Sequence, residues 1–306
     1  MGETKPGTRG AQPVLRRARQ LLRRWQAGQR VLPDFLIIGA QKSGTSSLFR
    51  YLGQHPQIRG SLPKEVHYFD GGFAGGTDTY TLGEDWYRTH FPLRRSMKPG
   101  QVAFEASPLY MLHPLAAGRI AALLPEVKLV AVLRNPTDRA LSHYFHNVRN
   151  NALRHHAEGL TPMQAMAEED ARLAPILAAA DYKNEIFRAF SYKARGRYLE
   201  QLERYWAHFP RERLLVLRAE DLFEDPAGLM RELCDFLGIE RIAEGLDFAA
   251  RNVGGNREPV DAETRAMLDA YFAPHNRALY DALGRDFGWE REPPRAQTTA
   301  QTAAGR

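Results

Sequence analysis

Short apolar runs alternate with amphipathic segments along this chain. Four runs have the composition of buried parallel strands: residues 35–38, 102–105, 128–133 and 214–217. Apolar residues at helical spacing lie between and after them, at 46–52, 85–91, 114–124, 137–149, 197–209 and 226–237, and in a last helix that Asp261 caps, Pro274 restarts and Gly284 ends. This alternation predicts an α/β fold of three layers, with a central, mostly parallel sheet flanked by helices.

The first apolar run leads into a loop bounded by Gly39 and Gly44, and a helix follows. Strand, loop and helix N-terminus of this kind point backbone N–H groups at one spot and favour a bound anion there. The loop is P-loop-like, but Thr45 stands where a nucleoside-triphosphate loop has its lysine, and Lys42 lies inside the loop instead. We therefore do not expect the loop to bind the β- and γ-phosphates of a nucleoside triphosphate. An ordinary strand–helix turn is the alternative.

Size and composition allow one large α/β domain or two small ones in 306 residues. The single cysteine, Cys234, excludes an internal disulfide and a Cys-rich metal site, which fits a reducing compartment such as the cytoplasm. No apolar run reaches roughly 18 residues, so we expect no spanning helix. Residues 150–180 read as a helical insert. Its adjacent His155 and His156 could suggest a metal, but such pairs usually face solvent, and we predict no metal site.

The net charge of +6 comes from the N-terminus. Residues 1–30 hold eight Lys and Arg against Glu3 alone, and the rest of the chain has 34 basic and 35 acidic residues, which gives no case for nucleic acid. We expect a flexible, solvated arm there; the alternative is that residues 14–25 form a basic helix that touches an anionic membrane surface. We expect an arm over 1–30, one domain over 31–291, and a disordered tail over 292–306.

The sequence from Gln41 to Ser47, placed after an apolar strand, resembles the 5′-phosphosulfate loop of sulfotransferases that use 3′-phosphoadenosine 5′-phosphosulfate (PAPS). The resemblance implies PAPS as the sulfuryl donor and no metal. It also implies that Lys42 neutralises the bridging oxygen as it leaves. The residues implied to hold the 5′-phosphate are Lys42, Ser43, Gly44, Thr45, Ser46 and Ser47.

A second polar stretch runs from Lys64 to Asp70. In a β-like run, alternation would put Glu65 and His67 on one face, where a carboxylate beside an imidazole can act as a general base. A surface loop that buries its apolar residues is the alternative. The order of loop, helix and this stretch resembles the sulfotransferase domains that modify heparan-type glycans. The resemblance implies Glu65 as the base, with His67 and Asp70 as supporting residues. We expect nearby Lys42 to keep Glu65 ionised.

Arg134 follows the apolar run 128–133, at a strand end where open α/β sheets bind ligands. Its guanidinium could bind a phosphate through two parallel hydrogen bonds. A structural salt bridge is the alternative. Arg134 and Pro136, followed by Arg139 and Ser142, resemble the "Arg-x-Pro…Arg-x-x-Ser" element of the same family. The resemblance implies recognition of a 3′-phosphate by Arg134 and Ser142. In the Gly-rich loop 251–259 it places Arg257 near the same phosphate; an ordinary connector is the alternative.

One departure concerns the acceptor. Glycan-modifying relatives commonly carry Lys where this chain has Ala106, so a heparan-like acceptor is in doubt, and the acceptor is predicted only as a hydroxyl or amine compound, such as a glycan. Two other functions stay open. A phosphate-loop kinase would need Lys after Gly44 and an acid at a strand end for Mg²⁺. A non-catalytic module that binds adenosine phosphates would keep Lys42 and Arg134 but tolerate loss of Glu65.

Overall fold

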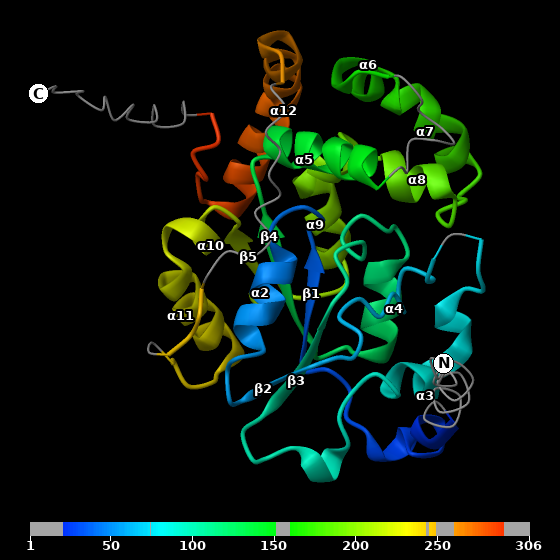
Figure 1. Ribbon diagram of the computed structural model, residues 1–306, viewed down its shortest axis with the longest axis vertical. Coiled ribbons are helices and arrows are strands. Elements are labelled where there is room, and N and C mark those ends of the chain that lie inside the picture. The colour runs from blue at the N-terminus through cyan, green and yellow to red at the C-terminus, as the bar shows by residue number, and fades with distance from the viewer. Residues whose placement is uncertain (1–20, 74, 151–159, 243–244, 249–259, 291–306) are drawn as a thin grey trace, which may run out of the picture.

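The computed structural model describes residues 21–73, 75–150, 160–242, 245–248 and 260–290. Five strands form one sheet in the order β2-β3-β1-β4-β5, and all four pairings are parallel (Figure 1). The strands are β1 (Phe35–Gly39), β2 (Ile58–Gly60), β3 (Val102–Ala106), β4 (Lys128–Leu133) and β5 (Leu214–Arg218). The four predicted strands and the parallel sheet are confirmed. The short edge strand β2 was not predicted, because three residues carry too little pattern.

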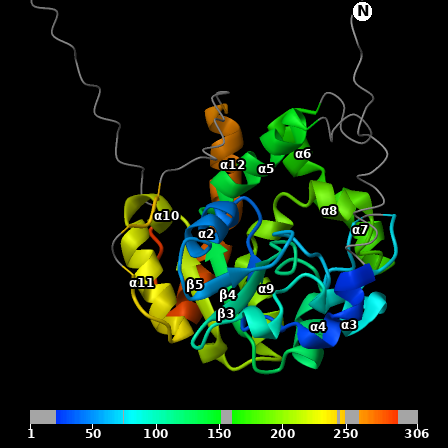
Figure 2. The same cartoon turned by 60° about the horizontal axis from the view of Figure 1, so that its bottom comes forward.

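Alternation along the strands gives the sheet two apolar faces. Leu36 and Leu129 face helices α4 (Ala116–Leu123) and α9 (Tyr198–Trp206). Their neighbours Phe35 and Val130 face helices α2 (Thr45–Leu52) and α11 (Pro226–Leu237) on the other side. Figure 2 shows the sheet between these two pairs of helices. The predicted three-layer α/β fold is therefore confirmed.

A further group of helices lies beyond the carboxyl ends of the strands, at the top of Figure 1. The group consists of α5 (Pro136–Arg149), α6 (Pro162–Ala167), α7 (Glu169–Ala178), α8 (Glu185–Phe190) and α12 (Ala262–Leu283). Buried residues such as Leu141, Met166 and Phe272 join α5, α6, α8 and α12 into a core of their own. Leu173 and Ile176 of α7 pack with Phe187 of α8 in a smaller cluster. The predicted helical insert over 150–180 is thus observed in its described part, and residues 151–159 lie outside the described residues.

The remaining elements are short. They are α3 (Gly83–Arg88), α10 (Asp221–Glu224), and the 3₁₀ turns η1 (Ala27–Gln29), η2 (Thr79–Leu82), η3 (Arg94–Ser96), η5 (Ala194–Gly196) and η6 (Arg211–Arg213).

Helix ends follow the predicted caps, with one exception. The Asp261 side chain accepts a hydrogen bond from the backbone N–H of Thr264 at the start of α12, and Gly284 ends that helix with a left-handed φ of 63°. The predicted restart at Pro274 is wrong, because Pro274 lies inside the continuous 22-residue α12. Proline removes one backbone donor, but the buried Phe272 and Leu279 hold the turns on either side against the protein.

The end of the predicted arm is packed on the domain. Ala27 and Arg30 are buried, and the Arg30 guanidinium donates to the carbonyl oxygen of Phe91 at 2.6 Å. The packed part of the chain therefore begins before the predicted boundary at residue 31. Residues 1–20 and the tail 292–306 lie outside the described residues. In the part that is described, no helix combines the length and apolarity needed to cross a membrane.

Candidate active site

The loop between β1 and α2 is built to receive an anion. Lys42 and Gly44 have left-handed φ angles of 72° and 83°. A Cβ on residue 44 would lie 2.5 Å from Cδ1 of Leu222, so both φ and space require glycine there. The Ser43 side chain is buried, and its Oγ has no hydrogen-bond partner among the described residues. A buried hydroxyl without a partner beside a helix N-terminus indicates a place for a ligand oxygen.

Positive charge gathers around this loop. Arg134, directly after β4, donates to the carbonyl oxygen of Lys42 at 3.3 Å, so the first and third predicted motifs meet. Burial, and then the charges of Arg149, Arg134 and Arg139, lower the pKa of Lys42 to about 8. In the described part of the chain, no carboxylate lies within ion-pair distance of Lys42, Arg134 or Arg149. Cations that lack acidic partners predict an anionic ligand of more than one charge.

Helix α5 brings the loop and the second motif into one site. Ser142 is half-buried on this helix, and His146 and Arg149 follow at i+4 and i+7 on the same face. Burial and the charges of Lys42 and Arg149 lower the pKa of His146, and the charge of Glu65 opposes that shift. His146 therefore lies within electrostatic reach of both Lys42 and Glu65. His146 and Arg149 were not predicted as site residues, although their spacing from Ser142 could have indicated them.

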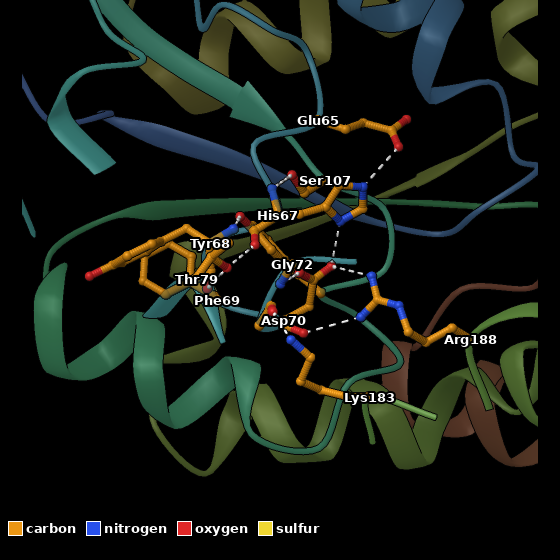
Figure 3. Close-up of polar contacts among 12 residues, drawn as sticks. Glu65, His67, Tyr68, Phe69, Asp70, Gly72, Thr79, Ser107, Lys183 and Arg188 are labelled. Carbon is orange, nitrogen blue, oxygen red and sulfur yellow. Dashed lines mark hydrogen bonds and ion pairs between the residues drawn. The ribbon is translucent and has the colours of Figure 1, made fainter. Parts of the chain in front are cut away.

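Glu65, His67 and Asp70 are joined through the His67 imidazole by an ion pair on one side and a hydrogen-bonded ion pair on the other (Figure 3). His67 Nδ1 lies 2.6 Å from Asp70 Oδ2, and His67 Nε2 lies 3.4 Å from Glu65 Oε2. The predicted proximity of Glu65 and His67 is observed. The predicted β-like run is wrong, because residues 64–70 form an irregular loop in which His67 has a left-handed φ of 55°. The contact comes from this bend in the chain, not from strand alternation.

The pKa values of His67 and Glu65 are shifted in opposite directions. Burial opposes charge on the imidazole, but the hydrogen bonds with Asp70 and Glu65 raise the pKa of His67 to about 9. Burial also opposes charge on Glu65, yet His67 and Lys64 lower the pKa of Glu65 to about 2. We expected Lys42 to be the cation beside Glu65, but the cation in contact is Lys64, with 2.7 Å between its Nζ and Oε1 of Glu65. At neutral pH an imidazolium thus lies between two carboxylates, of which Glu65 is the exposed one.

Helix α8 and the turn before it support the three side chains from the side (Figure 3). Arg188, on α8, donates to the Asp70 carbonyl oxygen at 3.2 Å and lies 3.8 Å from the Asp70 carboxylate. Lys183 donates to the carbonyl oxygen of Gly71 at 2.8 Å. Asp70 itself is fully buried and accepts a hydrogen bond from the backbone N–H of Gly72. Neither Arg188 nor Lys183 could be predicted as a site residue, since neither belongs to a motif and both lie far from Asp70 in the chain.

The remaining expectations about the site concern Arg257, Ala106 and metal ions. Arg257 and its loop lie outside the described residues. Ala106, where glycan-modifying relatives carry lysine, is fully buried at the end of β3. Across the described ranges, no group of three or more His, Cys, Asp or Glu side chains could hold a metal ion, and the expected independence from metal stays a prediction.

Comparison with known proteins identifies the family. The model of the sulfotransferase domain matches residues 32–252. This chain belongs to the sulfotransferase family. The match agrees with the resemblance seen in its three motifs, and it supports sulfuryl transfer over the phosphate-loop kinase considered above.

Individual relatives agree with this assignment. The chain is 30% identical to the membrane-associated sulfotransferase kil1 of Dictyostelium discoideum, over 85% of this chain and 67% of that protein. It is 31% identical to heparan sulfate glucosamine 3-O-sulfotransferase 3B1 of Mus musculus, over 86% of this chain and 66% of that protein. It thus spans about two thirds of the length of both relatives. A crystal structure of a sulfotransferase from Alicyclobacillus acidocaldarius aligns with 85% of this chain and 100% of its own, at 32% identity and a TM-score of 0.68.

Proposed function

We propose that this sulfotransferase moves the sulfuryl group of PAPS to a hydroxyl or amine of an acceptor. The observation that carries the proposal is the pairing of two opposite features in one site. One is the anion-binding loop around Lys42, whose cations lack acidic partners among the described residues. The other is the exposed, ionised carboxylate of Glu65. The charges of Lys42 and Glu65 both shift the pKa of His146, in opposite directions, so the two features lie near one another.

The donor side of the site suits two phosphate groups. The loop residues Ser43, Gly44, Thr45, Ser46 and Ser47 offer backbone amides and hydroxyls for the 5′-phosphate. Arg134 and Ser142 would bind the 3′-phosphate, and Arg257 would join them. The Lys42 ammonium would neutralise the bridging oxygen as the sulfur–oxygen bond breaks, a role worth roughly 3–4 kcal/mol for comparable electrostatic groups. No metal is needed for this division of roles.

On the acceptor side, Glu65 is the group able to take a proton. With a pKa of about 9, His67 is already protonated at neutral pH and cannot act as the base. Glu65 is a weak base, which is sufficient when the acceptor proton is lost only as the new oxygen–sulfur or nitrogen–sulfur bond forms. His67 would then orient Glu65, and Asp70 would hold the charged imidazole in place.

The acceptor class is inferred from one relative and from residue 106. One relative carries heparan sulfate glucosamine in its name, which makes a glycan hydroxyl our first candidate. The buried Ala106 removes the lysine that glycan-modifying relatives commonly place there, so the acceptor need not be as acidic as heparan sulfate.

Two further proposals concern where the protein acts. The basic residues of the N-terminal arm that precede the buried Arg30 could touch an anionic membrane surface, and one relative is named as membrane-associated. The one cysteine, Cys234, is a buried free thiol, which supports a cytoplasmic location. No feature of the sequence calls for a nucleic-acid partner.

A transfer assay tests the proposed function. The wild-type protein is incubated with PAPS labelled in its sulfuryl group, in the presence of a chelator, and with a panel of glycans, simple alcohols and amines. We expect labelled product with at least one acceptor. Tight binding of adenosine 3′,5′-bisphosphate without transfer to any acceptor would instead support the non-catalytic binding module.

A further inference from the structure

Glu105 is a buried carboxyl group that the proposed chemistry does not use. It lies on β3, and its exposed fraction is 0%. Three hydroxyl groups donate to its carboxylate: Tyr87 at 2.7 Å and Tyr110 at 2.9 Å to Oε1, and Ser107 at 3.1 Å to Oε2. A carboxylate in the interior is costly unless its oxygens are bonded, so such a complete set of donors calls for a role.

Two of the three hydroxyls also bind the backbone of the active-site loop. The N–H of His67 donates to Ser107 Oγ at 3.2 Å, and the N–H of Tyr68 donates to the Tyr110 hydroxyl at 2.9 Å. Because each hydroxyl accepts from a backbone N–H, its own hydrogen is free to point at Glu105. Two relays therefore run from the loop backbone through a hydroxyl to the same carboxylate.

The direction of these relays is fixed at the backbone end, because an N–H can only donate. At the other end, burial raises the pKa of Glu105 to about 7, while the hydrogen bonds from Tyr87, Tyr110 and Ser107 oppose that shift and favour the ionised form, which accepts from all three hydroxyls. A glutamine at this position would offer an amide N–H₂ to hydroxyls whose hydrogens already need an acceptor. The loop end also needs the support, because His67 has a left-handed φ of 55°, which is unfavourable for a residue with a side chain.

We propose that Glu105 is a positioning residue for the transfer reaction. Through Ser107 and Tyr110 it fixes the backbone of His67 and Tyr68, and so holds the imidazole between Glu65 and Asp70. This inference rests on the proposed function of Glu65 as the base.

The test compares two relay variants with a matched control. Ser107→Ala and Tyr110→Phe each remove one relay hydroxyl. Tyr205→Phe removes a hydroxyl that is also fully buried and that donates to the Tyr110 carbonyl oxygen at 2.8 Å, outside the relays. We expect each relay variant to lower kcat about 10-fold with the KM for PAPS unchanged, since small misplacement of catalytic groups has effects of this size. Tyr205→Phe should keep kcat within about twofold despite a similar loss of stability.

A second measurement does not depend on turnover. The titration of the His67 imidazole, followed by NMR, should show a lower pKa in Ser107→Ala than in the wild-type protein, because the ring loses its fixed place between Asp70 and Glu65. Equal kcat losses in the relay variants and in Tyr205→Phe, or an unchanged His67 titration, would overturn the inference. If the wild-type protein transfers no sulfuryl group but Ser107→Ala still lowers the pKa of His67, the proposed function is refuted, and Glu105 positions the His67 loop without a role in transfer.

Discussion

Replacing His67 with asparagine should change the pH dependence of folding in a defined way. In the folded protein, burial opposes the imidazolium, but Asp70 and Glu65 raise the pKa of His67 from 6.5 to about 9. A group whose pKa is raised by folding stabilises the folded state fully below its unfolded pKa. That contribution is lost as the pH rises through the folded value. A rise of this size corresponds to roughly 3 kcal/mol, and the His67 side chain is only 9% exposed, so solvent screening is limited.

The assay is urea unfolding of the wild-type protein and His67→Asn at a series of pH values from 5 to 10. Below about pH 6.5 the wild-type protein should be more stable than the variant by roughly 3 kcal/mol. This difference in the free energy of unfolding should shrink by about that amount between pH 6.5 and 9 and stay constant above that range.

His113→Asn provides a control of opposite sign. Burial lowers the pKa of His113 to about 4, so its contribution to stability should be present above pH 6.5 and be lost as the pH falls toward 4. A His67→Asn difference that stays constant from pH 6 to 10 would show that the imidazole is not held as an imidazolium between Glu65 and Asp70. A neutral His67 would then be able to accept the proton, and His67 would no longer be excluded as the base.

Three further predictions concern the donor site and the arm. Lys42→Ala should lower kcat by about 10²-fold or more while the affinity for adenosine 3′,5′-bisphosphate, measured by calorimetry, falls far less; intact turnover would remove Lys42 from the reaction. Arg134→Ala should weaken binding of adenosine 3′,5′-bisphosphate but hardly change binding of adenosine 5′-phosphate, and equal losses for the two ligands would refute the 3′-phosphate assignment. Deletion of residues 1–20, which precede every site residue, should leave specific activity within about twofold, and a collapse of activity in a folded truncation would place the arm in the site.

The sheet could be predicted because local patterns dominate in its interior. The runs at 35–38 and 128–133 are buried on both faces, so they read as continuous apolar segments. The strand-end position of Arg134 likewise follows from chain order alone, and the contact of its guanidinium with the Lys42 carbonyl oxygen agrees with that placement.

Predictions failed where tertiary contacts override local preference. The stretch around His67 reads as an extended run, but it bends because Ser107 and Tyr110 bind its backbone N–H groups. Pro274 reads as a helix break, but packing on both sides keeps the helix intact. Arg188 could not be predicted, because its contact with Asp70 joins α8 to the loop after residue 64, two segments that only the fold brings together.

The Glu65→Gln variant tests whether Glu65 is the base for sulfuryl transfer. Glu84→Gln is a matched control, because both carboxylates are 44% exposed and each is paired with a neighbouring cation. With labelled PAPS and the best acceptor of the panel, the account predicts that Glu65→Gln lowers kcat by about 10²-fold or more, while Glu84→Gln stays near the wild-type value. A Glu65→Gln variant that keeps most of the wild-type kcat would contradict the account.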